Sequence, residues 1–339
     1  MCYWRDLQQS LFPNLEDQLL PQTEKHGSVM VVLDMVDPAK LLSLRASTGR
    51  PPACRTALAS AFVAKAVLNL STTDALIDRL RCDKVLRHLC GFEPWKQLPC
   101  KATFSNAFKG FSESELPSKL HEILVKKSYE NRLVGHVSRD STDISVRETI
   151  PVSPKTKWKR VKGKKKRVRR QLTMTLEAMR LDLPKPADLG RKGPHRWKGY
   201  KLHLDCGDGG VPLSSVVTSA SLHDSQAAIY LEELTSRRVV SLYTLMDKAY
   251  DATEIREFVA KKNKVALISP QKRQGQVIWL DPAQRRRFQE RGTVERVFSR
   301  LKDHFGARYV NVRGHSKVTA HLMFGVLALT AEQLVRNFS

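Results

Sequence analysis

Apolar residues recur at helical spacing through the first third of the chain, from about residue 56 to residue 130. Polar residues suited to helix N-caps precede some of these runs, as the Ser-Thr-Thr triplet at residues 71–73 does. The pattern predicts helices over residues 57–66, 75–80, 85–90, 102–111 and 115–129. We therefore expect a helical domain over residues 45–130, suited to DNA binding or assembly, after a proline-bearing arm at residues 1–44.

From Arg132 onward the pattern changes to the alternation that is typical of strands. Residues 133–146 are rich in valine, isoleucine, serine and threonine and predict one extended strand or a hairpin. Residues 198–205 alternate strictly between polar and apolar positions. A Gly-Asp-Gly-Gly turn then leads into an apolar run at residues 211–219, so these two runs predict a β-hairpin.

The remainder of the chain alternates between strand and helix patterns. It predicts strands over residues 239–246 and 264–268, and helices over residues 251–262, 283–304 and 317–338. A hairpin followed by a β-α-β crossover and a charged helix indicates a mixed sheet. The expected fold class is α/β, with a mixed sheet flanked by helices over residues 131–339.

Composition and charge narrow the functional classes. Hydrophobic residues make up 41% of the chain and charged residues 27%, which is typical of globular proteins. The 58 lysines and arginines exceed the 34 acidic residues and give a formal net charge of +24, so we expect a nucleic-acid partner. No apolar run approaches the roughly 18 residues of a membrane span, so no membrane association is expected. The six cysteines lack paired spacing, which favours the cytoplasm.

More than half of the excess positive charge lies in one segment. Residues 151–200 carry 17 lysines and arginines against three acids. We expect residues 151–196 to be a basic, mobile segment that becomes ordered when it contacts phosphate. Its densest run supplies the expected DNA contacts of Lys164, Lys165, Lys166 and Arg167. A solvated loop without a partner is the alternative interpretation.

Two aspartates stand where predicted strands end. Asp140 is expected to end the first strand, and Asp247 directly follows the apolar residues of a later strand. Ligand crevices in open α/β sheets lie at the carboxyl ends of strands, so both acids are candidate site residues. A helix cap is the alternative role, and Asp251 fits it better than Asp247 because it is adjacent to the expected helix.

A third candidate group lies on the charged helix near the carboxyl terminus. Arg291, Glu295 and Lys302 have the spacing i, i+4 and i+11, so they share one helix face. One carboxylate is then flanked by two cations. An exposed ion pair of this kind is common in proteins and needs no function.

These three groups together resemble a known family. An aspartate in Asp-Ser-Thr at Asp140, an aspartate in Asp-Lys-Ala-Tyr-Asp at Asp247 and a helix reading Phe-x2-Arg-x3-Glu-x6-Lys from Phe288 are similar to bacterial insertion-sequence transposases of the DDE type with the Y-R-E-K signature. The signature tyrosine is Phe288 here, which keeps the ring and loses the hydroxyl. The likeness extends over about residues 45–338.

The resemblance implies a ribonuclease-H-like catalytic domain that cleaves DNA and transfers strands. Asp140, Asp247 and Glu295 would hold two Mg²⁺ ions, with Mn²⁺ able to substitute, and such ions can promote in-line attack on a phosphodiester. Arg291 and Lys302 would hold phosphates of double-stranded DNA beside them, and Phe288 would lie against the DNA. The expected partners are the element ends and the target, bound by a homo-oligomer in the bacterial cytoplasm at the nucleoid.

Some alternatives stay open. Asp143 rivals Asp140, and Glu290 rivals Glu295 without sharing its spacing to the arginine and lysine. A ribonuclease-H-like nuclease that cuts DNA without joining it would carry the same acids. A DNA-binding protein that has lost catalysis is a third possibility, which the intact set of two aspartates and one glutamate disfavours.

Overall fold

The computed structural model describes residues 23–42, 53–93, 95–149, 183–192, 194–269 and 280–338. Lys164, Lys165, Lys166 and Arg167 lie outside these ranges, so their expected DNA contacts stay a prediction. Of the segment expected to be basic and mobile at residues 151–196, the described part includes a short strand of the sheet.

The amino-terminal region is helical, as the apolar spacing predicts. Its helices are α3 (Glu24–Val36), η1 (Pro38–Leu41), α4 (Arg55–Val67), α5 (Thr73–Cys82), α6 (Lys84–Leu89), α7 (Lys101–Glu113) and α8 (Leu116–Tyr129). The Thr72 side chain caps α5 by accepting from the amide of Ala75. Helix α3 was not predicted and falls within the expected arm. Val29, Val32 and Val36 are buried on one face of it, which is the spacing of a helix that packs on a core.

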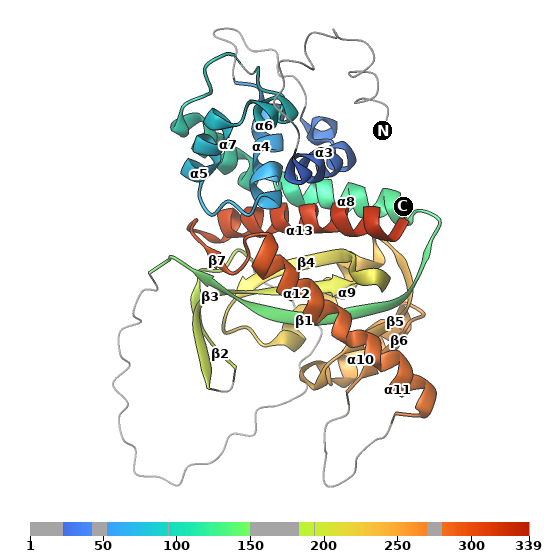
Figure 1. Ribbon diagram of the computed structural model, residues 1–339. Helices are drawn as coiled ribbons and strands as arrows, with labels where there is room; N and C mark the ends of the chain where they lie inside the picture. The colour runs from blue at the N-terminus through green and yellow to red at the C-terminus, as the bar shows by residue number, and fades with distance from the viewer. Residues whose placement is uncertain are drawn as a thin grey trace, which may run out of the picture.

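A seven-stranded mixed sheet forms the other half of the molecule (Figure 1). Its strands are β1 (Leu133–Val146), β2 (Asp188–Lys192), β3 (His195–Cys206), β4 (Pro212–Ser219), β5 (Val240–Met246), β6 (Val265–Ile268) and β7 (Tyr309–Val310). The main order is β2-β3-β1-β5-β6, with β4 paired to β3 and β7 to β1. β1 is antiparallel to β3 and parallel to β5, so the predicted mixed sheet is confirmed and β1 is a single strand.

The predicted hairpin and crossover both form. β3 and β4 pair antiparallel around a turn in which Gly209 and Gly210 adopt positive φ, a conformation that favours glycine. β5 and β6 are parallel, with α10 (Thr253–Lys261) between them. An additional helix, α9 (Asp224–Ser236), follows β4 in the chain and packs on β3 and β4. This helix was not predicted.

The carboxyl-terminal helices join the two halves. The helix predicted over residues 283–304 is two helices, α11 (Pro282–Phe288) and α12 (Gly292–His304), separated by the 3₁₀ turn η4 (Gln289–Arg291). The break adjoins Gly292, a residue of low helix propensity. Figure 1 shows α12 crossing the sheet and α13 (His315–Phe338) lying between the sheet and the amino-terminal helices.

Helix α13 is the centre of the hydrophobic core. It contacts α3, α4, α7 and α8 on one side and β4 on the other. One continuous cluster of buried apolar residues runs from α4 through α13 into β1 and β3. α13 is also the only helix in the described ranges long and apolar enough to cross a membrane, but 78% of its most apolar window is buried inside the protein. Such burial is typical of the core helix of a soluble protein.

Candidate active site

The two candidate aspartates lie side by side, Asp140 in the middle of β1 and Asp247 directly after the end of its parallel neighbour β5. The expectation that Asp140 ends its strand was wrong, because β1 continues to Val146 through its pairing with β3. β1 and β5 pair in register, with Ser138 opposite Leu245, and each aspartate follows two residues later. Asp140 is only 7% exposed. Burial raises the pKa of Asp140, and the negative charge of Asp247 raises it further, while the Ser141 amide and Arg291 oppose the shift.

Arg291 connects Asp140 to Glu295. One terminal nitrogen of its guanidinium donates to Asp140 Oδ2 at 3.0 Å, and the other donates to Glu295 Oε1 at 3.1 Å. The Ser138 hydroxyl donates to the carbonyl of Glu290 at 2.9 Å and so fixes the start of α12 against β1. The strand and the helix therefore bring Asp140 and Glu295 to the same guanidinium.

Asp247 has a second role beside its place at the strand end. Its Oδ1 accepts from the amide of Ala249 at 2.7 Å and caps the 3₁₀ turn η3 (Lys248–Tyr250). Asp251 was the expected helix cap, but α10 has no side-chain cap, and Asp251 pairs with Arg256 at 3.0 Å. The preference for Asp251 as the cap was wrong, because the chain makes an extra turn before α10 begins.

Lys302 shares the α12 face with Glu295 and pairs with a different acid. Its Nζ lies 2.9 Å from Asp143 Oδ1, and His195 Nε2 lies 3.5 Å from the other oxygen of Asp143. Burial opposes the ionised form of Asp143, but the hydrogen bond and charge of Lys302 lower its pKa overall. Asp143 thus pairs with Lys302 and is not linked to Glu295 as Asp140 is.

Phe288 lies half-buried at the end of α11.

Two family models match this chain. Residues 135–331 match the family described as "Transposase DDE domain", which is more than half of the 339 residues. The chain belongs to the DDE transposase family. Residues 16–110 match a second family, described as "Transposase domain (DUF772)". No curated protein and no solved structure matches the chain.

Membership fixes the general activity of the protein. It is a DNA transposase with a ribonuclease-H-like fold, and its family consists of nucleotidyl-transferase-type enzymes that act on DNA and use divalent metal ions. The matched region includes Asp140, Asp247 and the Glu295 of α12.

The transposase places a further acid beside the site that the sequence analysis did not single out. Asp224 begins α9, and its Oδ1 accepts from the Ser141 hydroxyl at 2.8 Å and from Lys201 Nζ at 2.9 Å. Burial opposes its ionised form, but Lys201 and His203 lower its pKa overall. The His-Asp-Ser triplet that starts at His223 was the available signal, because a polar residue before such a run can begin a helix.

A buried hydroxyl lies among three of these acids. The Tyr250 hydroxyl has no hydrogen-bond partner within the described part of the chain. Burial raises its pKa, and the charges of Asp224, Asp140 and Asp247 raise it further. The negative charges of all three aspartates therefore act on this one buried hydroxyl.

The donor types suit a divalent metal. Carboxylate oxygens are the ligands that Mg²⁺ prefers, and Asp140, Asp247 and Glu295 supply them. Among the described residues, however, no three acid, histidine or cysteine side chains are arranged as a ready metal cluster. Arg291 engages one oxygen of Asp140 and one of Glu295, and the Glu295 side chain is 60% exposed and free to rotate. The residues fit Mg²⁺ chemically, provided that Arg291 exchanges its partners.

Proposed function

We propose that this transposase cleaves DNA at the ends of an insertion sequence and joins the freed ends to target DNA. The catalytic residues are Asp140, Asp247 and Glu295. The observation that carries the proposal is the juxtaposition of Asp140, within β1, and Asp247, at the end of the adjacent parallel strand β5, with Glu295 linked to Asp140 through Arg291. Acids gathered from one strand, the end of its neighbour and one helix would face a bound phosphodiester together.

The three acids would hold two Mg²⁺ ions, with Mn²⁺ able to substitute. When bound, such ions activate water and stabilise the attacking and leaving oxygens of an in-line displacement. The raised pKa of Asp140 supports a cation at this place, because burial and the nearby Asp247 both disfavour its ionised form. A divalent cation offsets both effects.

The cations of the helical signature would hold DNA. Arg291 already lies between two of the acids, so its guanidinium is placed to bind a phosphate oxygen beside them once it releases their carboxylates. Its Nε is buried without a partner among the described residues and is available as a further donor. Lys302 offers a second charge farther along α12. Phe288, in place of the signature tyrosine, would contact DNA through its ring alone.

The partner is double-stranded DNA, both the element ends and the target. The net charge of +24 favours a polyanion, and the run at Lys164, Lys165, Lys166 and Arg167 adds an expected contact outside the described residues. We infer a homo-oligomer on DNA, since two element ends must be joined, acting in the bacterial cytoplasm at the nucleoid.

The test is DNA cleavage and joining by purified full-length variants. Asp140→Asn, Asp247→Asn and Glu295→Gln should each retain DNA binding and lose cleavage, because an amide keeps the shape but not the charge that holds Mg²⁺. Glu290→Gln is the matched control on the preceding turn and should cleave normally. Normal cleavage by any of the three variants would remove that residue from the site. Cleavage without joining by the wild type would identify a nuclease instead.

A further inference from the structure

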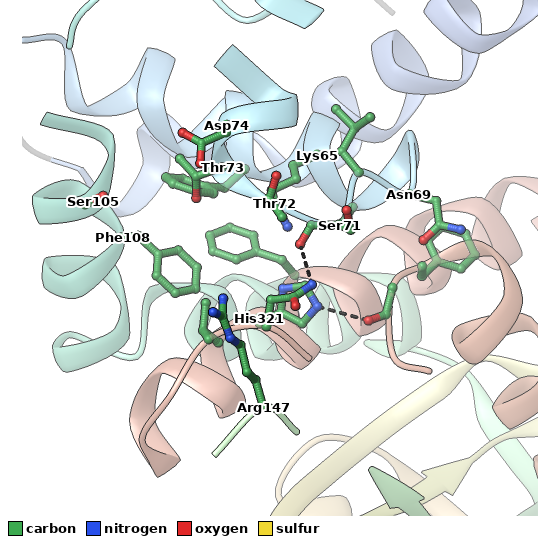
Figure 2. Close-up of a pocket in the computed structure, with 18 of the residues that line it drawn as sticks. Lys65, Asn69, Ser71, Thr72, Thr73, Asp74, Ser105, Phe108, Arg147 and His321 are labelled. Atoms are coloured by element: carbon green, nitrogen blue, oxygen red, sulfur yellow. Dashed lines mark hydrogen bonds between the residues drawn. The ribbon is translucent and has the colours of Figure 1, made fainter. Parts of the chain in front are cut away.

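A cavity of about 230 Å³ lies outside the active site, at the junction of the amino-terminal helices and the catalytic half (Figure 2). Its lining comes from α4 and α5 on one side and from the ends of β1 and α12 and from α13 on the other. Figure 2 shows Lys65, the turn at residues 71–73, Arg147 and His321 around this hollow.

Lys65 lines the cavity and is buried without a counter-charge. It is 8% exposed, and no described residue gives its ammonium a hydrogen bond or an ion pair. Burial lowers its pKa to about 8. A buried unpaired ammonium is costly, and buried charges in proteins are normally paired.

The other ionisable groups of the lining leave this charge unbalanced. Arg147 is exposed at the cavity, and its guanidinium has no partner in the described ranges. The acid Asp74 is already paired with Lys101 at 2.7 Å. Burial lowers the pKa of His321 to about 4, so its ring is neutral near pH 7. Lys65 and Arg147 therefore face the cavity without an ion-pair partner among the described residues.

Hydrogen-bond donors face the same space. The first turn of α5 borders it through Thr72, Thr73 and Asp74, and a helix N-terminus presents free amides and positive partial charge. The hydroxyls of Ser71 and Thr73 also line the cavity. Together with Lys65, these groups form the kind of site that binds a tetrahedral oxyanion.

We propose that this cavity binds a phosphate group, with Lys65 and Arg147 as its cations and the first turn of α5 as its donor. The volume accommodates a phosphate together with part of the group that carries it. If the proposed function holds, the natural source is a backbone phosphate of the bound DNA. Free phosphate is the other source of the same chemistry.

The position relative to the active site favours DNA. Arg147 follows Asp140 by seven residues along β1, which is about 23 Å at the rise of a strand. That length corresponds to about seven base pairs of duplex. A second hollow, which includes Lys302 and Arg308, shares Asn69 and His321 with this cavity. This second hollow thus adjoins the phosphate cavity and includes Lys302 of the helical signature, although Lys302 and Arg308 each pair with an acid.

The first arm of the test uses inorganic phosphate and thermal unfolding of the full chain. At ten times its Kd, phosphate should raise the melting temperature of the wild type by about 2 °C more than that of Lys65→Met. Phosphate also stabilises proteins nonspecifically, and Lys25→Met, which removes an exposed charge from α3, should show the full wild-type shift. Arg147→Gln, at an exposed position, should lose part of the phosphate-induced rise in melting temperature. This variant replaces Lys65→Met in the test if Lys65→Met does not fold.

The second arm uses duplex DNA with a single neutral methylphosphonate placed 5–9 base pairs from the cut. The substitution should weaken binding by the wild type several-fold and weaken binding by Lys65→Met less, because the variant keeps only Arg147 and the α5 donors as phosphate contacts. If phosphate raises the melting temperature of the wild type more than that of Lys65→Met, but the methylphosphonate affects both proteins equally, the cavity binds free phosphate. If the two proteins differ only in their response to the methylphosphonate, the cavity binds the DNA backbone. Equal responses of wild type and Lys65→Met in both arms would overturn the proposal. Neither arm measures cleavage, so a failure here is separate from a failure of the active-site variants.

Discussion

Adjacent residues of β1, Arg139 and Asp140, project to opposite faces of the sheet and enter two different ionic clusters. Arg139 is completely buried and donates to both oxygens of Asp205 at 2.7 Å and to Glu232 at 2.8 Å. Asp140 meets Arg291, which also holds the largely exposed Glu295. The first cluster lies among β1, β3, α9 and the residue that precedes β6, whereas the second opens to solvent along α12.

The difference lies in how completely each charge is balanced. In the buried cluster, Lys264 Nζ donates to Glu232 at 2.8 Å, so two cations face two acids. In the open cluster, Asp140 lies beside Asp247, and burial with this like charge raises the Asp140 pKa. A closed and balanced set stabilises one arrangement, while an open set with excess negative charge can exchange partners. Two adjacent residues of β1 therefore serve different purposes: Arg139 belongs to a cluster that stabilises the fold, and Asp140 belongs to one that is suited to binding.

The largest effect should come from opening the buried cluster. Arg139→Met leaves Asp205 and Glu232 buried with less positive charge, so we expect the free energy of unfolding to fall by about 3–5 kcal/mol. Urea denaturation measures the change. Arg256→Met breaks the pair with Asp251 on a partly exposed surface and should cost less than about 1 kcal/mol. Similar losses for both variants would contradict the stabilising role assigned to the buried cluster.

Asp140→Asn should show the opposite profile. We expect cleavage to fall by about a thousandfold, or about 4 kcal/mol in the barrier, without a loss of stability. The Asp140 pKa is raised in the folded state, so the folded protein binds more protons than the unfolded chain and loses stability as pH rises through that pKa. The variant should therefore be at least as stable as the wild type at pH 7, and the difference should shrink below about pH 4. Urea titrations at both pH values decide this, and a marked destabilisation at pH 7 would show that Asp140 is mainly structural.

Lys65 extends the comparison, because it is buried as Arg139 is but lacks any counter-charge. Its pKa of about 8 lies below the usual 10.5, so between these values the unfolded chain binds more protons and stability rises with pH. The other charged groups of the cavity are Arg147, the pair of Asp74 with Lys101, and the neutral His321. In phosphate-free buffer at pH 7, Lys65→Met should be more stable than the wild type by about 3 kcal/mol. A gain that persists at pH 10.5 would exclude the charge as its cause.

Parts of this arrangement follow from the sequence and others do not. The end of an apolar strand located Asp247, and helical spacing placed Glu295 and Arg291 on one face. Asp140 was identified as a candidate, but it lies within β1 and not at the expected strand end. Helical spacing says nothing about partners from other elements, so the bond from Arg291 to Asp140, 151 residues away, was not predictable. The same limit explains why the Lys302 pair with Asp143 was not foreseen.

The burial of individual charged side chains, which depends on tertiary packing, also could not be predicted from the sequence. Lys65 stands near the end of α4, where a lysine is favourable to the helix dipole and gives no sign of burial. α13 and the ends of β1 and α12 enclose it only in the folded chain. Asp224 was missed because α9 itself was not predicted. The positions of carboxylates at element ends were thus predictable, and the closure of clusters around them was not.

The smallest effect tests whether Arg291 competes with metal. Arg291→Ala should weaken joining by about 1.5–3 kcal/mol, the value of a hydrogen bond to a charged group, because phosphate loses a donor. Mn²⁺ should not restore this loss. The Mg²⁺ concentration for half-maximal activity should nevertheless fall, because Asp140 and Glu295 are released from the guanidinium that occupies one oxygen of each.

Lys302→Ala is the matched control for that measurement. This variant removes a cation from the same helix face, but the partner of Lys302 is Asp143 and not one of the proposed metal ligands. Joining should therefore weaken, while the Mg²⁺ concentration for half-maximal activity stays constant. Glu295→Asp shortens a proposed ligand and should need more Mg²⁺, with partial rescue by Mn²⁺, which binds such sites more tightly. If Arg291→Ala instead required more Mg²⁺, the guanidinium would be orienting the carboxylates for metal. The open cluster would then be preorganised by its arginine, as the buried cluster is by Arg139.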